Sequence, residues 1–334
     1  MMRRATLVVG LGLAIGCAAI RPSGSVLVSD GRYAMGTVLE ITLVASDEAS
    51  GRAALDELFA LAERLERVFT VFDAQSAVSR LNRAAGRGPQ PVDAELAALL
   101  ERARQHSELT GGAFDVTVGP LVALWKRAAA HNVLPSATEL SAALAHVGWE
   151  QVRVVGRRSV LLEGPGVTVD LGGVAKGWAL DRMRVLLERR DIDRALFNFG
   201  QSSVWALGRP GSDTAWQLLA RGPGGGFLGV LHLRDLALSV SGSLGQSVEI
   251  GGRRFGHVVD PRTGHALERR RQALVVGPDA TLAEALSKAL LVLGAEEGLG
   301  LVAEQPGCEA LLVDAEGGAW RTPGWDSATG FAAF

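Results

Sequence analysis

The chain has 334 residues, enough to bury a substantial core in one large domain or two modest ones. Its 34 basic and 36 acidic side chains give a formal net charge of -2, which gives no reason to expect nucleic acid as a partner. Gly occurs 42 times, and this abundance indicates many tight turns and places where the backbone approaches another group closely.

The start of the chain has the layout of a secretory signal. Arg3 and Arg4 precede an uncharged, mostly apolar run over residues 5–16, which is too short to span a membrane. The run ends at Cys17 in a sequence that resembles a lipoprotein signal, in which the cysteine is lipidated and becomes the new N-terminus. Ala14 stands where such signals usually have Leu, so cleavage without lipidation is the alternative.

Three regions are therefore expected along the chain. Residues 1–17 form the signal, residues 18–32 a linker, and residues 33–334 one folded domain. The second cysteine, Cys308, lies in an apolar stretch and is expected to be a small core residue, with no disulfide framework.

Helices dominate the first half of the expected domain, and strands dominate the second. The first half is expected to contain a strand over 37–44, a helix over 49–68, a helix capped by Asp93 that ends near Leu109, and a helix opened by a capping box of Ser136 and Glu139. The second half is expected to contain three short strands within 151–171, helices over 174–190 and 282–293, strands over 195–199, 204–207, 216–220, 229–233, 237–240, 273–276, 310–313 and 319–322, and a hairpin over 248–259. This order favours an α+β fold over a regular alternation of strands and helices.

A glycine turn at residues 169–178, Val-Asp-Leu-Gly-Gly-Val-Ala-Lys-Gly-Trp, joins a strand directly to a helix. Such a turn directs free backbone N–H groups and the positive end of the helix to one place, which favours phosphate. Lys176, in the first helical turn, could add a positive charge at a pyrophosphate. Phosphate binding and an ordinary turn both remain open on this segment alone.

Two earlier segments are weaker signals. Residues 111–120, Gly-Gly-Ala-Phe-Asp-Val-Thr-Val-Gly-Pro, place Asp115 between apolar neighbours, and the simpler interpretation is an Asp that caps the following helix. Met35 and Gly36 precede the first expected strand, where a glycine is usually only a turn.

Two later segments contain candidate catalytic groups. His257 leaves a strand just before an Asp-Pro turn, where it could act as a general base near neutral pH or merely hydrogen-bond the turn. Glu284 and Lys288 are four residues apart on one helix face, and alone they indicate an ordinary ion pair of about 0.2–0.5 kcal/mol.

In this order and spacing, the five segments resemble the ApbE family of FAD:protein FMN transferases. The similarity runs from about residue 34 to residue 294, and its most specific parts are GAFDVTVGPL, DLGGVAKGWALD and HVVDPRTG. The resemblance implies a single domain of mostly antiparallel sheets with packed helices. It also implies a bacterial envelope protein that binds FAD, holds Mg²⁺ at the pyrophosphate, and transfers FMN to a Thr or Ser hydroxyl of another protein with release of AMP.

The resemblance also implies roles for particular residues. Residues that match the family's FAD contacts are Met35, Phe72, Ala113, Phe114, Asp115, Asp170 and Lys176. Phe72 stands where the family usually has a flavin-contacting Tyr. His257 would deprotonate the acceptor hydroxyl, and the carbonyl of Gly173 would ligate Mg²⁺.

This sequence departs from the family at the remaining metal positions. Glu284 and Lys288 stand where the family has an Asp and a Thr that ligate the metal. Glu still offers oxygen ligands, whereas an ammonium group cannot ligate, would repel the metal and could instead lie against the pyrophosphate. A second departure is Gln201, which replaces a glycine and adds a side chain where backbone would otherwise approach closely.

Three functions therefore remain open. They are FMN transfer, flavin binding without transfer as a carrier or partner in an envelope redox complex, and hydrolysis of FAD by a pyrophosphatase. The resemblance and the signal together imply a location on the periplasmic side of the envelope, with a lipid anchor if Cys17 is modified. The implied acceptor is a flavoprotein subunit of an envelope electron-transfer complex.

Overall fold

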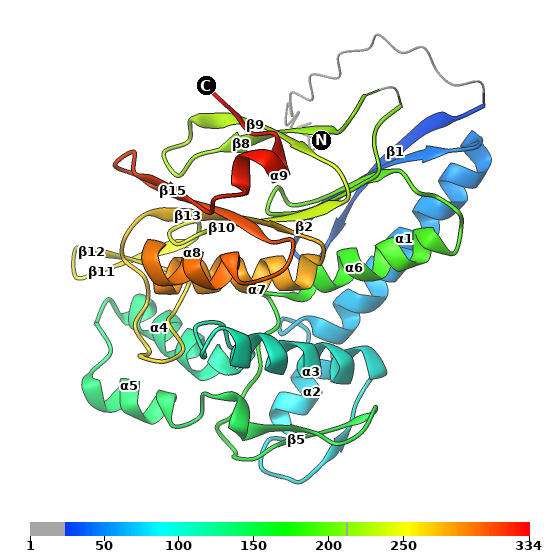
Figure 1. Cartoon of the computed structure of the whole chain (residues 1–334). Coiled ribbons are helices and arrows are strands. Elements are labelled where there is room, and N and C mark those ends of the chain that lie inside the picture. Colours follow the sequence, from blue (N-terminus) through cyan, green and yellow to red (C-terminus); the bar gives the residue numbers. More distant parts are fainter. Residues whose placement is uncertain (1–23, 212) are drawn as a thin grey trace, which may run out of the picture.

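The computed structural model describes residues 24–211 and 213–334 (Figure 1). The expected signal, with Cys17, and the first part of the expected linker lie outside these residues. Among the described helices, none combines the length and the apolar character that a membrane span requires.

An eight-stranded antiparallel sheet forms the centre of the fold, in the order β1-β2-β6-β7-β10-β13-β14-β15. Its strands are β1 (Val26–Ala34), β2 (Thr37–Ala45), β6 (Ala195–Phe199), β7 (Ser203–Leu207), β10 (Leu236–Gly242), β13 (Arg271–Gly277), β14 (Glu309–Asp314) and β15 (Ala319–Arg321). Helices cover one face of this sheet, and a smaller sheet lies on the other face (Figure 1).

The helical side consists of two layers (Figure 1). The helices are α1 (Glu48–Phe69), α2 (Ala77–Arg83), α3 (Ala94–Leu109), α4 (Gly119–His131), α5 (Ala137–Leu144), α6 (Ala175–Glu188), α7 (Ala280–Leu293), α8 (Ala295–Ala303) and α9 (Trp325–Thr329). Helices α1, α6 and α7 pack directly against the sheet, so that Leu58 and Leu180 share one core with Ile41 and Phe197. Helices α2 to α5 lie farther from the sheet (Figure 1).

Three small sheets complete the fold. They contain β3 (Gln90–Pro91), β5 (Ser159–Leu162) and β4 (Val152–Val154); β16 (Ala332–Ala333), β9 (Phe227–Leu233) and β8 (Trp216–Arg221); and β11 (Ser247–Ile250) with β12 (Arg253–Gly256). The β16-β9-β8 sheet and α9 cover the far face of the main sheet, where Trp325 is fully buried against Leu231 and Val204. The predicted α+β class with mostly antiparallel sheets is confirmed.

Two predicted helix caps are also confirmed. The Asp93 carboxylate accepts a hydrogen bond from the backbone N–H of Glu95 at 2.8 Å, where α3 begins. Ser136 and Glu139 form both bonds of the capping box at the start of α5. The sequence predicts these caps because each one involves residues only two or three positions apart.

Strand β1 corrects the expected linker, because residues from Val26 onward are paired rather than connecting. β1 pairs with β2 over its whole length, from Val26 opposite Ala45 to Ala34 opposite Thr37. Met35 and Gly36 have φ values of +47° and +78°, the left-handed pair that a two-residue hairpin turn requires. The sequence does not predict this strand, because most of its residues are exposed or only partly buried at the sheet edge and show no apolar alternation.

The prediction of a third strand within residues 151–171 is wrong. Only β4 and β5 form there, and Val169 lies outside any strand. The side chain of Asn82 accepts from the Val169 N–H and donates to the Val169 carbonyl, both at 2.9 Å. This amide therefore satisfies the backbone groups that a neighbouring strand would otherwise pair.

Cys308 is buried and free, as predicted for a small core residue. It packs with Leu286 and Val275 between α7 and the sheet. Burial raises the pKa of its thiol to about 11, so the thiol stays protonated and unreactive at neutral pH.

His106 on α3 makes the fold sensitive to acid. Its side chain is 3% exposed, and neither ring nitrogen has a hydrogen-bond partner in the described residues. Burial, reinforced by the Arg102 charge, lowers its pKa from 6.5 to about 4. The unfolded chain therefore binds the proton first as the pH falls below 6.5, and the folded state is destabilised.

We expect this histidine to lower the free energy of unfolding by about 2 kcal/mol between pH 7 and pH 5. Guanidinium unfolding at both pH values should show a smaller pH dependence in His106→Leu than in the parent protein, by about that amount. Equal pH dependence in the two proteins would contradict the assignment.

Candidate active site

The glycine turn before α6 provides unpaired backbone donors. Val174 and Ala175 donate to the Leu171 carbonyl at 2.9 and 2.8 Å, which closes the turn. Gly172 donates to the Asp170 carboxylate at 2.9 Å. In the described part of the chain, the N–H groups of Gly173 and Lys176 donate to no protein acceptor. These groups, at the positive end of α6, are available to an anion.

Lys176 extends from this turn toward the β6–β7 turn. Its ammonium group donates to the Ser202 hydroxyl. In the same turn, Gly200 and Gln201 have φ values of +64° and +59°. Glycine adopts this left-handed conformation without cost, whereas Gln201 must tolerate it and holds its side chain exposed.

The loop before α4 is organised by Asp115, which is buried. Its carboxylate accepts from the Ser107 hydroxyl at 2.8 Å, and from the N–H and hydroxyl of Thr117 at 2.8 and 2.6 Å. This confirms the capping interpretation, because the carboxylate is engaged within its own loop. The neighbouring residues Ala113 and Phe114 are also buried. A contact of this loop with FAD stays a prediction.

His257 directly follows β12 and lies at the surface. Its Nδ1 is 3.1 Å from the carbonyl oxygen of Gln246 and 3.3 Å from the Gln246 N–H, which fixes the ring against this backbone. Partial removal of the ring from water lowers the pKa of His257. The hydrogen bond with Gln246 raises this pKa, and the charge of Lys288 lowers it. His257 is therefore mostly neutral at pH 7, the form that a general base requires.

Glu284 and Lys288 on α7 do not form the expected ion pair. In the described residues, no Lys288–carboxylate pair lies within 4.0 Å. Glu284 is 1% exposed, and its carboxylate accepts from the Gly177 N–H at 3.0 Å and from the Ser203 hydroxyl. The carboxylate thus ties α7 to α6 and to β7, which the i,i+4 spacing alone could not indicate.

Lys288 connects the separate segments into one site. A Cβ placed on Gly173 would lie 3.8 Å from Lys288 Cε and 3.6 Å from the Phe114 ring, so these two side chains border the glycine turn. The charges of Lys288 and Lys176 repel each other, and Lys288 also acts on His257. The structure therefore gathers the glycine turn, two lysines and the histidine in one place.

Two further predicted FAD contacts come from other segments of the chain. Met35 is in the β1–β2 turn and packs against the main core. Phe72 is 89% exposed, and its ring is 5.8 Å from the ammonium group of Lys126. Their roles toward FAD stay predictions.

Several polar residues that support the site carried no recognisable sequence signal. Ser203 fixes Glu284, and Gln246 fixes His257. Asp181 on α6 accepts from the N–H groups of Ala280 and Thr281 at 2.9 Å each, and so caps α7. Burial first, and then the charge of Asp279, raises the pKa of Asp181 to about 6. The contacts of Ser203 and Asp181 join residues 81 or more positions apart, whereas Gln246 and His257 are 11 positions apart.

The residues at the implied metal position do not fit Mg²⁺. This ion requires near-octahedral oxygen ligands. No group of three or more His, Cys, Asp or Glu side chains suited to a metal occurs among the described residues. Both oxygens of Glu284 already accept hydrogen bonds, and the ammonium group of Lys288 adds a positive charge beside them. These residues therefore do not support a step through a bound metal ion.

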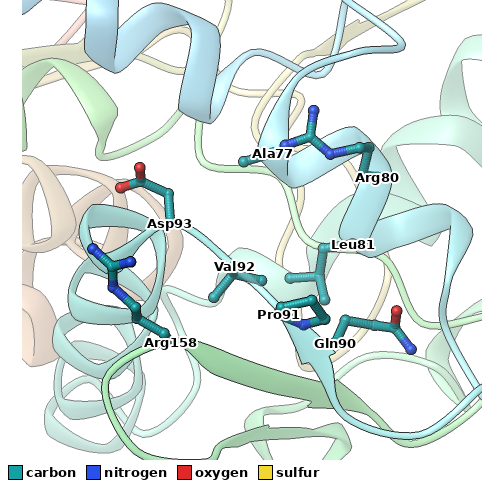
Figure 2. A pocket seen from close by; sticks show the side chains of 8 residues that line it. All are labelled: Ala77, Arg80, Leu81, Gln90, Pro91, Val92, Asp93 and Arg158. Atoms are coloured by element: carbon teal, nitrogen blue, oxygen red, sulfur yellow. The ribbon is translucent and has the colours of Figure 1, made fainter.

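A surface pocket lies elsewhere on the protein. Its volume is about 400 Å³, and the residues that line it, among them Arg80, Asp93 and Arg158, come from α2, β3 and the segments before α3 and β5 (Figure 2). It contains none of the predicted site residues. The candidate site is defined instead by the convergence of its side chains.

The fold and the site define a protein that can hold a phosphate-containing ligand beside a neutral histidine. Residues 35–312 match the ApbE family, and the chain belongs to this family. It is 30% identical over 310 residues to an FAD:protein FMN transferase of Klebsiella pneumoniae, covering 90% of this chain and 88% of the relative. It is 33% identical over 298 residues to the FAD:protein FMN transferase of Treponema pallidum, covering 84% and 82%.

Solved structures agree with this assignment. The ApbE protein of Thermotoga maritima superposes with a TM-score of 0.81 at 29% identity, covering 90% of this chain and 99% of that one. The apo form of the flavinyl transferase ApbE of Pseudomonas stutzeri gives a TM-score of 0.81 at 26% identity, covering 93% and 99%. The predicted family and its single-domain α+β fold are thus confirmed.

Proposed function

We propose that this protein is an FAD:protein FMN transferase, which moves FMN from FAD to a Thr or Ser hydroxyl of an acceptor protein. The observation that carries this proposal is the match to the family over residues 35–312, in which curated relatives have this activity as their name. Lys176 and Lys288 at the glycine turn supply positive charge for the pyrophosphate, and neutral His257 supplies a base.

In the proposed reaction, the acceptor oxygen attacks the phosphorus of the FMN half of FAD. A new P–O bond to the acceptor forms, the bond to the bridging oxygen breaks, and AMP leaves with that oxygen. Neutral His257 takes the proton of the attacking hydroxyl. The N–H groups of Gly173 and Lys176 and the lysine ammonium groups offset the negative charge on the pyrophosphate.

The acceptor and the location follow from the same proposal. The proposed acceptor is a flavoprotein subunit of an electron-transfer complex in the bacterial envelope. The proposed location is the periplasmic side of the envelope, with a lipid anchor at Cys17, and the signal layout of the first residues supports it. Mass spectrometry of the mature N-terminus tests the anchor directly.

We expect the purified protein, incubated with FAD and an acceptor domain that carries its Thr, to attach FMN to that residue. Intact-mass spectrometry detects the FMN adduct on the acceptor, and chromatography detects one AMP for each adduct. An acceptor with Thr→Ala at the modified position is the control and should stay unlabelled. Free FMN and AMP without labelling would indicate FAD hydrolysis instead, and bound but unchanged FAD would indicate flavin binding without transfer.

A further inference from the structure

The two lysines of the site are unusual for this chain. Lys occurs only three times, at positions 126, 176 and 288, among 34 basic side chains, so the remaining 31 are Arg. Arginine is the cation in every ion pair among the described residues, whereas two of the three lysines lie beside the glycine turn. A lysine ammonium is a compact point charge that fits a single phosphate oxygen, in contrast to the broad fork of arginine.

Lys288 stays mostly charged at pH 7, although burial, opposed by the charge of Glu284 and reinforced by that of Lys176, lowers the pKa of its ammonium group to about 8. Its stem passes Gly173, and the facing charged or titratable groups are Glu284, Lys176 and His257. Glu284 is the single carboxylate among these, and it is held by Gly177 and Ser203 rather than by Lys288. Two positive charges thus face one carboxylate that is already hydrogen-bonded, and the excess charge favours an anion.

We propose that Lys288, together with Lys176, replaces the divalent cation of the reaction, so that FMN transfer by this protein does not require magnesium. The inference rests on the proposed function. The two ammonium groups supply the two positive charges that one Mg²⁺ would bring, and as hydrogen-bond donors they stabilise the negative charge that develops on departing AMP. Glu284 acts as a structural tie between α6, α7 and β7.

The test measures acceptor labelling with excess EDTA and with added Mg²⁺. We expect rates that agree within about twofold in the two conditions. Lys288→Met keeps the length of the side chain without its charge, and should lower the rate by about 100-fold or more in both conditions. Arg157→Met, which removes one positive charge from the exposed turn between β4 and β5, should leave the rate unchanged.

A binding measurement gives a readout that is independent of catalysis. Fluorescence titration should give the same affinity for FAD with EDTA and with Mg²⁺. Lys288→Met should weaken FAD binding about tenfold and leave binding of riboflavin, which has no phosphate, unchanged.

The outcomes separate the inference from the proposed function. Labelling that is lost in EDTA and restored by Mg²⁺ would overturn the inference and leave the transferase function intact. An FAD affinity that rises tenfold or more with Mg²⁺ would overturn it as well. Absence of labelling in every condition would reject the proposed function and, with it, the metal-free reaction.

Discussion

Replacement of His257 by Gln is expected to lower the rate of FMN transfer by about 10²–10⁴-fold, the contribution that a positioned general base usually makes. Gln keeps a polar side chain of similar reach but cannot accept the proton of the acceptor hydroxyl. The backbone of Gln246 holds the His257 ring in place, and the lowered pKa keeps it neutral at pH 7. The loss should therefore be specific to proton transfer, with FAD affinity unchanged within about twofold.

The matched control is His265→Gln, which makes the same change on the same loop. The His265 side chain is exposed. In the described residues only its backbone takes part in the turn, where its carbonyl accepts from the Asp260 N–H at 2.9 Å. Labelling rates for the two variants and the parent, measured by intact mass, give the comparison. A His257→Gln rate within fivefold of the parent would exclude the histidine as the base.

The sequence predicted those parts of the fold whose signals are local. The capping box at Ser136 and the Asp93 cap were readable because each uses residues a few positions apart. Strand β1 could not be predicted in this way, because it is a strand through its pairing with β2 and not through a pattern of its own. Likewise, no local pattern near Val169 indicates that Asn82 takes its hydrogen bonds.

The same distinction holds for the site. The glycine turn and His257 stood out because glycine and histidine have special conformational and chemical properties. The tie from Glu284 to Gly177 and Ser203 joins positions 107 and 81 residues apart, and no spacing rule could find it. The i,i+4 rule instead paired Glu284 with Lys288, because it describes an isolated helix and takes no account of the elements packed around it.

Gly177, whose N–H donates to Glu284, lies where α6 packs closely against the backbone at the start of α7. A Cβ on Gly177 would lie 2.5 Å from the Ala280 carbonyl oxygen and 2.9 Å from the Thr281 nitrogen, and backbone atoms cannot move aside as a flexible side chain can. We expect Gly177→Ala to lower the free energy of unfolding by about 2–4 kcal/mol, through overpacking and through strain in the hydrogen bond to Glu284. Guanidinium unfolding measures this change.

The same substitution at Gly300, inside α8, should instead raise the free energy of unfolding. No atom lies within 4 Å of a Cβ at that position, so Gly300→Ala gains helix propensity and stabilises by about 0.5–1 kcal/mol. Because Lys288 is on α7, displacing this helix should also slow transfer in Gly177→Ala and leave it unchanged in Gly300→Ala. Equal unfolding free energies for the two variants would show that α6 and α7 do not approach this closely, and that Lys288 is positioned by other contacts.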